Sequence, residues 1–188
     1  MPLSDNDLLE KIRAGDNRVF AQLVDRYKDR AMTLAVRMLR NREDAEEAVQ
    51  DSFVRAYHGL DNFEGTAKFG TWFYRIIYNV CLTRIGKKKM DFESIDAESG
   101  DLPEIHDEHS LTPHEILELK DLVGILKKII ESMPVQYRTI ISLFYVQEMS
   151  YLEICKVTDL PLGTVKAHLF RARALLQRRL AERVEAFS

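Results

Sequence analysis

Aromatic and basic side chains gather in one stretch of the sequence, AKFGTWFYRIIYNVCLTRIGKKK, residues 67–89. The stretch holds five aromatic and six basic side chains and no acidic one. Aromatic rings can stack on unpaired bases while Lys and Arg side chains bind phosphates, so this composition suits single-stranded nucleic acid. The alternative is an ordinary core helix whose extra rings pack under neighbouring helices. The stretch by itself leaves both interpretations open.

Helical spacing in this stretch predicts a helix from Thr71 to about Gly86, preceded by a loop that contains Lys68 and Phe69. One apolar stripe is expected to face the core, and it consists of Phe73, Ile76, Ile77, Val80 and the stem of Arg84. The remaining aromatic residues fall outside this stripe, and they are Trp72, Tyr74 and Tyr78. Aromatic rings outside the stripe must pack either on other helices or on a ligand.

A second pattern lies in MSYLEICKVTDLPLGTVKAHLFRARALLQRRL, residues 149–180. Ser150 and Glu153 have the spacing of a capping box, which predicts a short helix from Tyr151. The segment 159–161, Asp-Leu-Pro, ends that helix, and Thr164 is expected to cap a longer second helix. Two helices joined by such a short turn are typical of a DNA-binding helix-turn-helix.

The expected second helix has a core side and a basic side. The core side consists of Val165, Leu169, Ala172, Leu176 and Leu180. The opposite side consists of Ala167, Arg171, Ala174 and Arg178, flanked by Lys166 and Phe170. Five basic residues and no acidic residue occur between residues 160 and 181, and small alanines would let the helix approach a groove. A basic amphipathic helix on an unrelated bundle is the alternative.

Helical spacing and capping residues also dominate the rest of the chain, so we expect an all-α protein. Helices are expected at residues 5–14, at 20–38 and after a cap at Asn41, and no sustained alternation indicates strands. We expect two small helical domains, residues 1–90 and 113–188, joined by a flexible acidic linker, residues 91–112. Thr112 and Pro113 are expected to open the next helix.

The net charge of -3 hides an uneven distribution along the chain. Residues 1–90 carry a net charge of +3, residues 91–121 of -10 and residues 122–188 of +4. Two mildly basic segments therefore flank an acidic one, which is compatible with nucleic-acid binding despite the overall sign. The acidic segment is either an imitation of nucleic acid in a basic channel or a plain solubilising tether. Pairing between the two domains is expected to be weak.

No pattern in the sequence indicates an enzyme. There is no Gly-rich phosphate loop, and His106, His109 and His114 lie in or beside the acidic segment without metal-ligand spacing. Cys81 and Cys155 are expected to be buried thiols rather than a disulfide. We therefore predict no catalytic residue, no metal site and no cofactor. Without a leader or membrane-span pattern, the expected location is the cytoplasm, with no membrane insertion.

These motifs, in this order, resemble the extracytoplasmic-function sigma factors, the smallest class of the sigma-70 family of bacterial transcription initiation factors. The matching stretches are FAQLVDRYKDRAMTLAVRML, DAEEAVQDSFVRAY, FGTWFYRIIYNV, the acidic linker and YLEICKVTDLPLGTVKAHLFRARALL. The resemblance implies sigma region 2 before the linker and region 4 after it. It also implies three partners, which are core RNA polymerase, promoter DNA and an anti-sigma factor acting in a stress response.

The resemblance further implies roles for individual residues. Recognition and melting of the minus-ten element would fall to Lys68, Phe69, Trp72, Arg75 and Asn79, with a flipped base taken up near residues 64–69. Major-groove recognition of the minus-thirty-five element would fall to Thr164, Lys166, Ala167, Phe170 and Arg171. Docking on core polymerase would use the acidic side of the helix after Asn41, which presents Asp44, Glu47, Gln50 and Asp51.

Two other classes of protein remain as alternatives. A helix-turn-helix repressor, or a protein like the output domain of a response regulator, would explain residues 149–180 but not the acid-free aromatic stretch. Tight binding to a palindromic site without polymerase would favour it. An enzyme is the second alternative, and hydrolase activity or bound metal would favour that.

Overall fold

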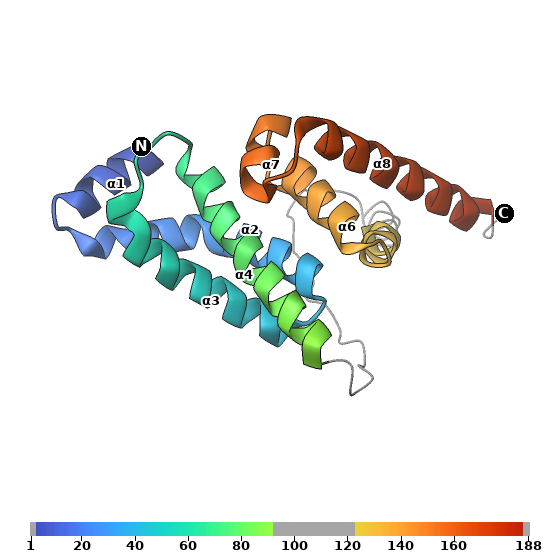
Figure 1. Cartoon of the computed structure of the whole chain (residues 1–188), viewed down its shortest axis with the longest axis horizontal. Coiled ribbons are helices and arrows are strands. Elements are labelled where there is room, and N and C mark those ends of the chain that lie inside the picture. The colour runs from blue at the N-terminus through green and yellow to red at the C-terminus, as the bar shows by residue number, and fades with distance from the viewer. Residues whose placement is uncertain (1–2, 92–122, 186–188) are drawn as a thin grey trace, which may run out of the picture.

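The computed structural model describes residues 3–91 and 123–185, and all regular structure within these two ranges is helical (Figure 1). The predicted all-α fold is therefore confirmed. The predictions for the acidic linker, for Thr112 and Pro113 and for the three histidines near them fall on residues 92–122, outside the described residues. Among the described helices, none combines the length and apolar character needed to cross a membrane.

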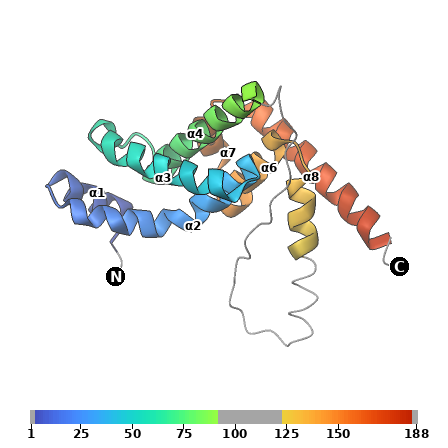
Figure 2. The same ribbon diagram turned by 90° about the horizontal axis from the view of Figure 1, so that it is seen from below.

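The first range forms one helical unit. Its elements are α1 (Asp5–Arg13), η1 (Asn17–Val19), α2 (Phe20–Leu39), α3 (Arg42–Gly59), η2 (Leu60–Asn62) and α4 (Phe69–Asp91). The three long helices α2, α3 and α4 contact one another, and α1 packs on α2 (Figures 1 and 2). Asn41 caps α3, as predicted, because its side chain accepts a hydrogen bond from the backbone N–H of Asp44 at 2.9 Å.

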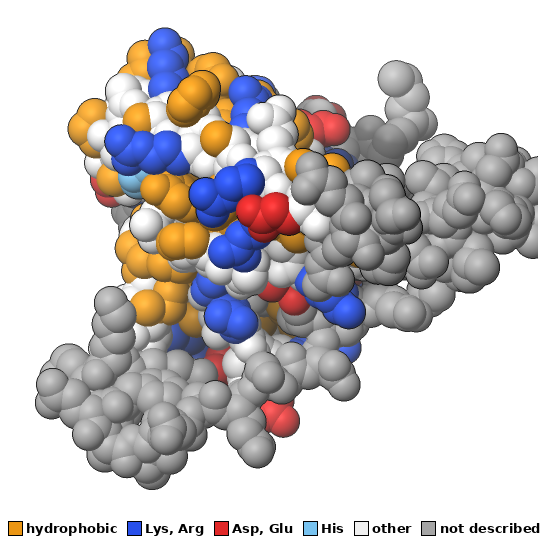
Figure 3. Space-filling model, turned by 90° about the vertical axis from the view of Figure 1, so that its right-hand side faces the viewer, with side chains coloured by type: hydrophobic (Ala, Val, Ile, Leu, Met, Phe, Trp, Pro, Cys, Tyr) orange, Lys and Arg blue, Asp and Glu red, His pale blue; other side chains and the backbone are white. Residues whose placement is uncertain are grey.

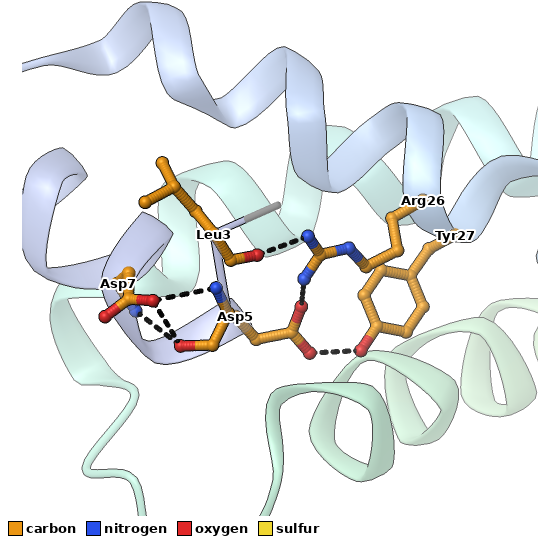
Figure 4. A network of polar contacts seen from close by, with 6 residues as sticks. Leu3, Asp5, Asp7, Arg26 and Tyr27 are labelled. Atoms are coloured by element: carbon orange, nitrogen blue, oxygen red, sulfur yellow. Dashed lines mark hydrogen bonds and ion pairs between the residues drawn. The ribbon is translucent and has the colours of Figure 1, made fainter. Parts of the chain in front are cut away.

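Polar contacts fix α1 against α2 (Figure 4). Ser4 and Asp7 form a capping box at the start of α1. Asp5 then reaches α2, where one carboxylate oxygen accepts a hydrogen bond from Arg26 and the other accepts one from the hydroxyl of Tyr27. Burial and the hydrogen bond to Asp5 raise the pKa of Tyr27, so its hydroxyl stays a donor at all physiological pH values.

An aromatic cluster fills the space between α2, α3 and α4. The ring centroids of Phe53 and Phe73 lie 4.5 Å apart, and those of Phe69 and Phe73 lie 5.9 Å apart in a stacked arrangement. Tyr27 meets the edges of both Phe69 and Phe73. These contacts exclude water from α4 along the side that faces the other two long helices.

The second range contains helical residues 123–131, α6 (Val135–Ile141), the π-helical turn η3 (Ser142–Val146), α7 (Tyr151–Thr158) and α8 (Leu162–Glu185). Most of its buried apolar side chains come from α6, η3, α7 and α8, and they include Ile140, Leu143, Ile154, Val157, Val165 and Leu169. The helix α8 runs outward, so its last turns lie far from the first unit (Figure 1).

The two units pack directly on each other, contrary to the expectation of weak pairing. The helix α7 lies along α4, and α6 and η3 lie against α2. Buried apolar residues from both ranges form one continuous cluster. Helical periodicity could not predict this contact, because it reports which side of a helix is apolar and not which domain covers that side.

Candidate nucleic-acid interface

The helix α4 carries the candidate residues for single-stranded DNA. It begins at Phe69 rather than at the predicted Thr71, and it extends to Asp91. Lys68 precedes the helix with 81% of its side chain exposed, and Arg75 has 47% exposed. Asn79 is exposed one turn beyond Arg75. These three side chains therefore lie outside the core, where Lys68 pairs with Glu153 and Arg75 pairs with Asp159.

Two of the predicted base-contacting rings lie in the core of the first unit or against it. Phe69 is only 2% exposed, because its ring is enclosed by Tyr27, Phe63 and Phe73. Trp72 is half-buried, with its ring centroid 5.0 Å from that of Phe63. In this arrangement the ring of Phe69 has no surface to offer to a base.

The other rings outside the predicted stripe also pack inside the protein. Tyr74 is 3% exposed, and burial raises its pKa. Tyr78 is half-buried, and burial together with the nearby Asp159 carboxylate raises its pKa. The simpler interpretation, packing on neighbouring helices, therefore accounts for most of the aromatic content of residues 67–89. The sequence pattern does not show that α4 is covered on two sides. The helices α2 and α3 cover one side, and α7 covers the other.

The helix-turn-helix has the predicted geometry at its first helix and its turn. Ser150 and Glu153 form the capping box of α7, and Asp159 ends α7 in the left-handed conformation with φ 57°. The second helix begins at Leu162, so the prediction that Thr164 caps it is wrong. Thr164 lies inside the first turn of α8 and is half-buried.

The outer side of α8 presents the candidate major-groove residues. Lys166 and Arg171 are exposed, Phe170 is 73% exposed, and Ala167 is half-buried. Of the predicted core stripe, Val165, Leu169 and Ala172 face inward at 0–1% exposure, and Leu176 and Leu180 are half-buried. An exposed phenylalanine beside two basic side chains on a recognition helix suits contact with a thymine methyl group and phosphates. Lys and Arg side chains also outnumber acidic ones on the described surface seen from the end where α8 terminates (Figure 3).

The acidic side of α3 forms a third surface. Gln50 is exposed, and Asp44 and Asp51 are half-buried. Glu47 pairs with Arg84 of α4 at 2.9 Å, and Asp51 pairs with Arg55 at 3.0 Å. Beside this surface, a groove of about 670 Å³ runs between α2 and α3. Gln50 is one of the residues that line this groove, and its apolar lining consists of Phe20, Val24, Met32, Val49, Phe53, Val54 and Tyr57.

No group of three or more His, Cys, Asp or Glu side chains with the geometry to hold a metal ion occurs within residues 3–91 and 123–185. Cys81 is buried and unpaired, and burial raises the pKa of its thiol to about 12. Cys155 is half-buried and is also unpaired. Both thiols are therefore unpaired, as expected. Cys81 is buried as expected, whereas Cys155 is only half-buried.

A helix-turn-helix with a basic outer side, together with a second exposed basic side on α4, defines a helical DNA-binding protein. Comparison with known families makes the class specific. Residues 23–90 match Sigma-70 region 2, and residues 124–176 match Sigma-70, region 4. The chain belongs to the extracytoplasmic-function sigma factors of the sigma-70 family.

Curated relatives match nearly the whole chain. The ECF RNA polymerase sigma factor SigW of Bacillus subtilis is 35% identical over 179 residues, covering 93% of this chain and 95% of SigW. The ECF RNA polymerase sigma-E factor of Escherichia coli K12 is 34% identical over 187 residues, with 95% of each chain covered. That of Haemophilus influenzae is 33% identical over 183 residues, covering 95% of this chain and 96% of the relative.

Solved structures share the fold. CnrH, determined in complex with the cytosolic domain of CnrY, superposes with a TM-score of 0.62 at 26% identity, covering 93% of this chain and 96% of CnrH. The sigma factor RpoE of Bartonella quintana, determined in complex with the anti-sigma factor NepR, superposes with a TM-score of 0.69 at 22% identity. That match covers 86% of this chain and 96% of RpoE.

Proposed function

We propose that the chain directs core RNA polymerase to promoters by reading two DNA elements. The observation that carries this proposal is the outer side of α8, where Lys166, Phe170 and Arg171 are exposed in a chain of the sigma-70 family. In this proposal residues 1–90 serve as region 2, residues 91–112 as a linker and residues 113–188 as region 4. The chain acts by binding and not by catalysis, in the cytoplasm.

In region 4, α8 enters the major groove at the minus-thirty-five element. The first turns of a recognition helix meet the base edges, and Thr164, Lys166, Ala167, Phe170 and Arg171 all belong to these turns. Arg171 hydrogen-bonds a guanine or a phosphate, Phe170 contacts a thymine methyl group, and Lys166 binds a phosphate. Ala167 lets the helix approach the groove floor.

In region 2, the exposed side of α4 binds the melted minus-ten strand. Lys68 and Arg75 hold phosphates, and Asn79 hydrogen-bonds a base or the backbone. Trp72 and Phe69 support this side from within, because their rings pack on Phe63. Binding energy for the unpaired strand offsets the cost of separating the duplex.

The acidic side of α3 docks on core RNA polymerase through Asp44, Glu47, Gln50 and Asp51. Carboxylates arranged along one side of a helix suit a basic partner surface and raise the rate of encounter with it. The neighbouring groove between α2 and α3 continues this surface with apolar area.

We also propose that an anti-sigma factor holds the chain inactive until a stress response releases it. Two proteins of the same fold were each solved in a complex, CnrH with the cytosolic domain of CnrY and RpoE of Bartonella quintana with the anti-sigma factor NepR. This supports the presence of an anti-sigma factor and does not identify it.

Run-off transcription tests the proposed function. The purified chain is mixed with bacterial core RNA polymerase and a fragmented genomic library from its host. We expect new start sites that share two spaced upstream motifs. If no transcript depends on the chain and the chain alone binds a palindromic duplex tightly, the repressor alternative replaces this proposal.

A further inference from the structure

The contact between the two units is built around a buried arginine. Arg138 of α6 is 7% exposed, and its guanidinium donates hydrogen bonds to the carbonyl oxygens of Arg37 and of Met38, the latter at 3.1 Å. It also donates to the carbonyl of Met133, within its own unit, at 2.9 Å. Arg37 and Met38 lie in the last turn of α2, where carbonyl oxygens lack helical partners and the helix dipole is negative.

The charge of Arg138 is retained in this buried position. Burial, reinforced by the nearby Arg40, lowers the pKa of Arg138 to about 10, which still leaves the guanidinium protonated at neutral pH. A second buried side chain of region 4, Gln147, donates to the carbonyl of Arg30 in α2 at 3.0 Å. The contact therefore resembles a packed interior rather than a loose encounter. Its polar pairing is incomplete, since the side-chain oxygen of Gln147 and one guanidinium nitrogen of Arg37 are buried without a hydrogen-bond partner.

Beyond this buried contact, α7 covers part of the exposed side of α4 with two carboxylates. The carboxylate of Glu153 forms an ion pair with Lys68 at 2.9 Å, and the carboxylate of Asp159 forms one with Arg75 at 2.7 Å. Lys68 and Arg75 are the two cations assigned above to the phosphates of the melted strand. The carboxylate oxygens lie at the distances expected for bound phosphate oxygens.

We propose that the free protein closes on itself, with Glu153 and Asp159 occupying the phosphate positions of α4 and Arg138 holding the two units together. This inference rests on the proposed DNA-binding role of α4. In the closed form a melted strand and α7 compete for the same two cations. Core polymerase, by separating the units, would release Lys68 and Arg75 from these two carboxylates.

Zero-length cross-linking tests closure on the chain alone. A water-soluble carbodiimide joins an amine to a carboxylate only where the two are in contact, so we expect a Lys68–Glu153 amide within the monomer at low salt. The Lys28–Asp25 pair, at 2.8 Å within α2, is the internal positive control because it forms whether or not the units separate. Formation of the Lys28–Asp25 product without the Lys68–Glu153 product would overturn the inference.

Competition with DNA is tested by a double variant, Glu153→Gln with Asp159→Asn. Gln keeps the capping box and Asn tolerates the left-handed conformation, so α7 is expected to keep its fold. The matched control, Asp25→Asn with Glu182→Gln, also removes two carboxylates from ion pairs, both away from α4. We expect the double variant to bind a fluorescein-labelled mixed-sequence 15-nucleotide single strand at least about threefold more tightly than the control at low salt.

The two failures are distinguishable. Equal affinities of the double variant and the control would refute competition between α7 and DNA, even if the chain still directs transcription by core polymerase. Conversely, an intact cross-link and a tighter double variant in a chain that supports no transcription would leave the closed form standing and refute the proposed function.

Discussion

At the residue scale, substituting Arg171 and Arg178 one at a time distinguishes recognition of a base from nonspecific attraction of positive charge to DNA. Both are exposed arginines of α8, but Arg171 lies nearer the helix start and Arg178 lies two turns further on, where it pairs with Glu182. A specific base contact contributes about 1–3 kcal/mol. We therefore expect Arg171→Ala to reduce promoter-dependent transcription by about 5- to 150-fold.

The measurement is run-off transcription at limiting holoenzyme on a promoter found in the genomic library. Arg178→Ala is the matched control and should remain within about twofold of wild type. Equal losses in the two variants would show that α8 contributes only positive charge and would contradict base reading by Arg171.

Phe69 and Lys68 are neighbours in the sequence with opposite environments, so their substitution should affect different quantities. Truncating the enclosed ring by Phe69→Ala should lower the free energy of unfolding by about 3–5 kcal/mol. Lys68→Ala removes an exposed side chain and should leave that free energy within about 1 kcal/mol while weakening promoter opening. Urea unfolding and permanganate reactivity of the melted strand measure the two effects. A stable Phe69→Ala protein with a specific melting defect would restore the direct base contact predicted from the sequence.

At the scale of single elements, α7 links pH to stability through its capping box. Partial burial opposes ionisation of Glu153, but hydrogen bonds from Ser150 and the contact with Lys68 outweigh it and lower the pKa of Glu153 from 4.5 to about 2. A carboxyl group whose pKa is lower in the folded state than in the unfolded state stabilises the fold at pH values above its unfolded-state pKa. This stabilisation is lost as the pH falls through the folded-state pKa. The stabilising effect of ionised Glu153 should therefore disappear between about pH 4.5 and pH 2.

Urea unfolding of wild type and Glu153→Gln checks this linkage. We expect wild type to be the more stable protein near about pH 6, and the difference to shrink as the pH approaches about 2 to 3. Glu182→Gln, on the outer end of α8, is the control. A difference that stays constant over this range would contradict an ionised Glu153 at the start of α7.

The elements also show how far the sequence could predict this molecule. Caps at Asn41 and Ser150 were predictable because they depend on residues three positions apart. The start of α8 was misplaced, since Thr164 has the character of a cap but Leu162 already follows the turn at Pro161. The spacing places Tyr74 outside the predicted stripe and leaves its partner open, because one periodic stripe describes burial on one side only, whereas α4 is covered on two. No pattern of spacing could place Arg138 on the end of α2, which lies about a hundred residues earlier in the chain.

At the scale of the whole molecule, Arg138 determines whether the two units behave as one body. Its three acceptors are carbonyl oxygens, two of them in the other unit, so Arg138→Met would leave the last turn of α2 without these donors. An open arrangement returns these carbonyls to water, and the two units should then separate. We expect the radius of gyration from small-angle X-ray scattering to increase in Arg138→Met at low salt.

Arg55→Met is the matched control for this variant, because it removes an exposed arginine whose ion pair lies within α3. Its radius of gyration should equal that of wild type. Circular dichroism should show unchanged helix content in both variants, which separates opening from unfolding. Exposed ion pairs are screened by salt whereas the buried Arg138 contact is not, so high salt alone should expand wild type less than Arg138→Met does. If salt expands wild type fully, Lys68 and Arg75 rather than Arg138 hold the closed form together.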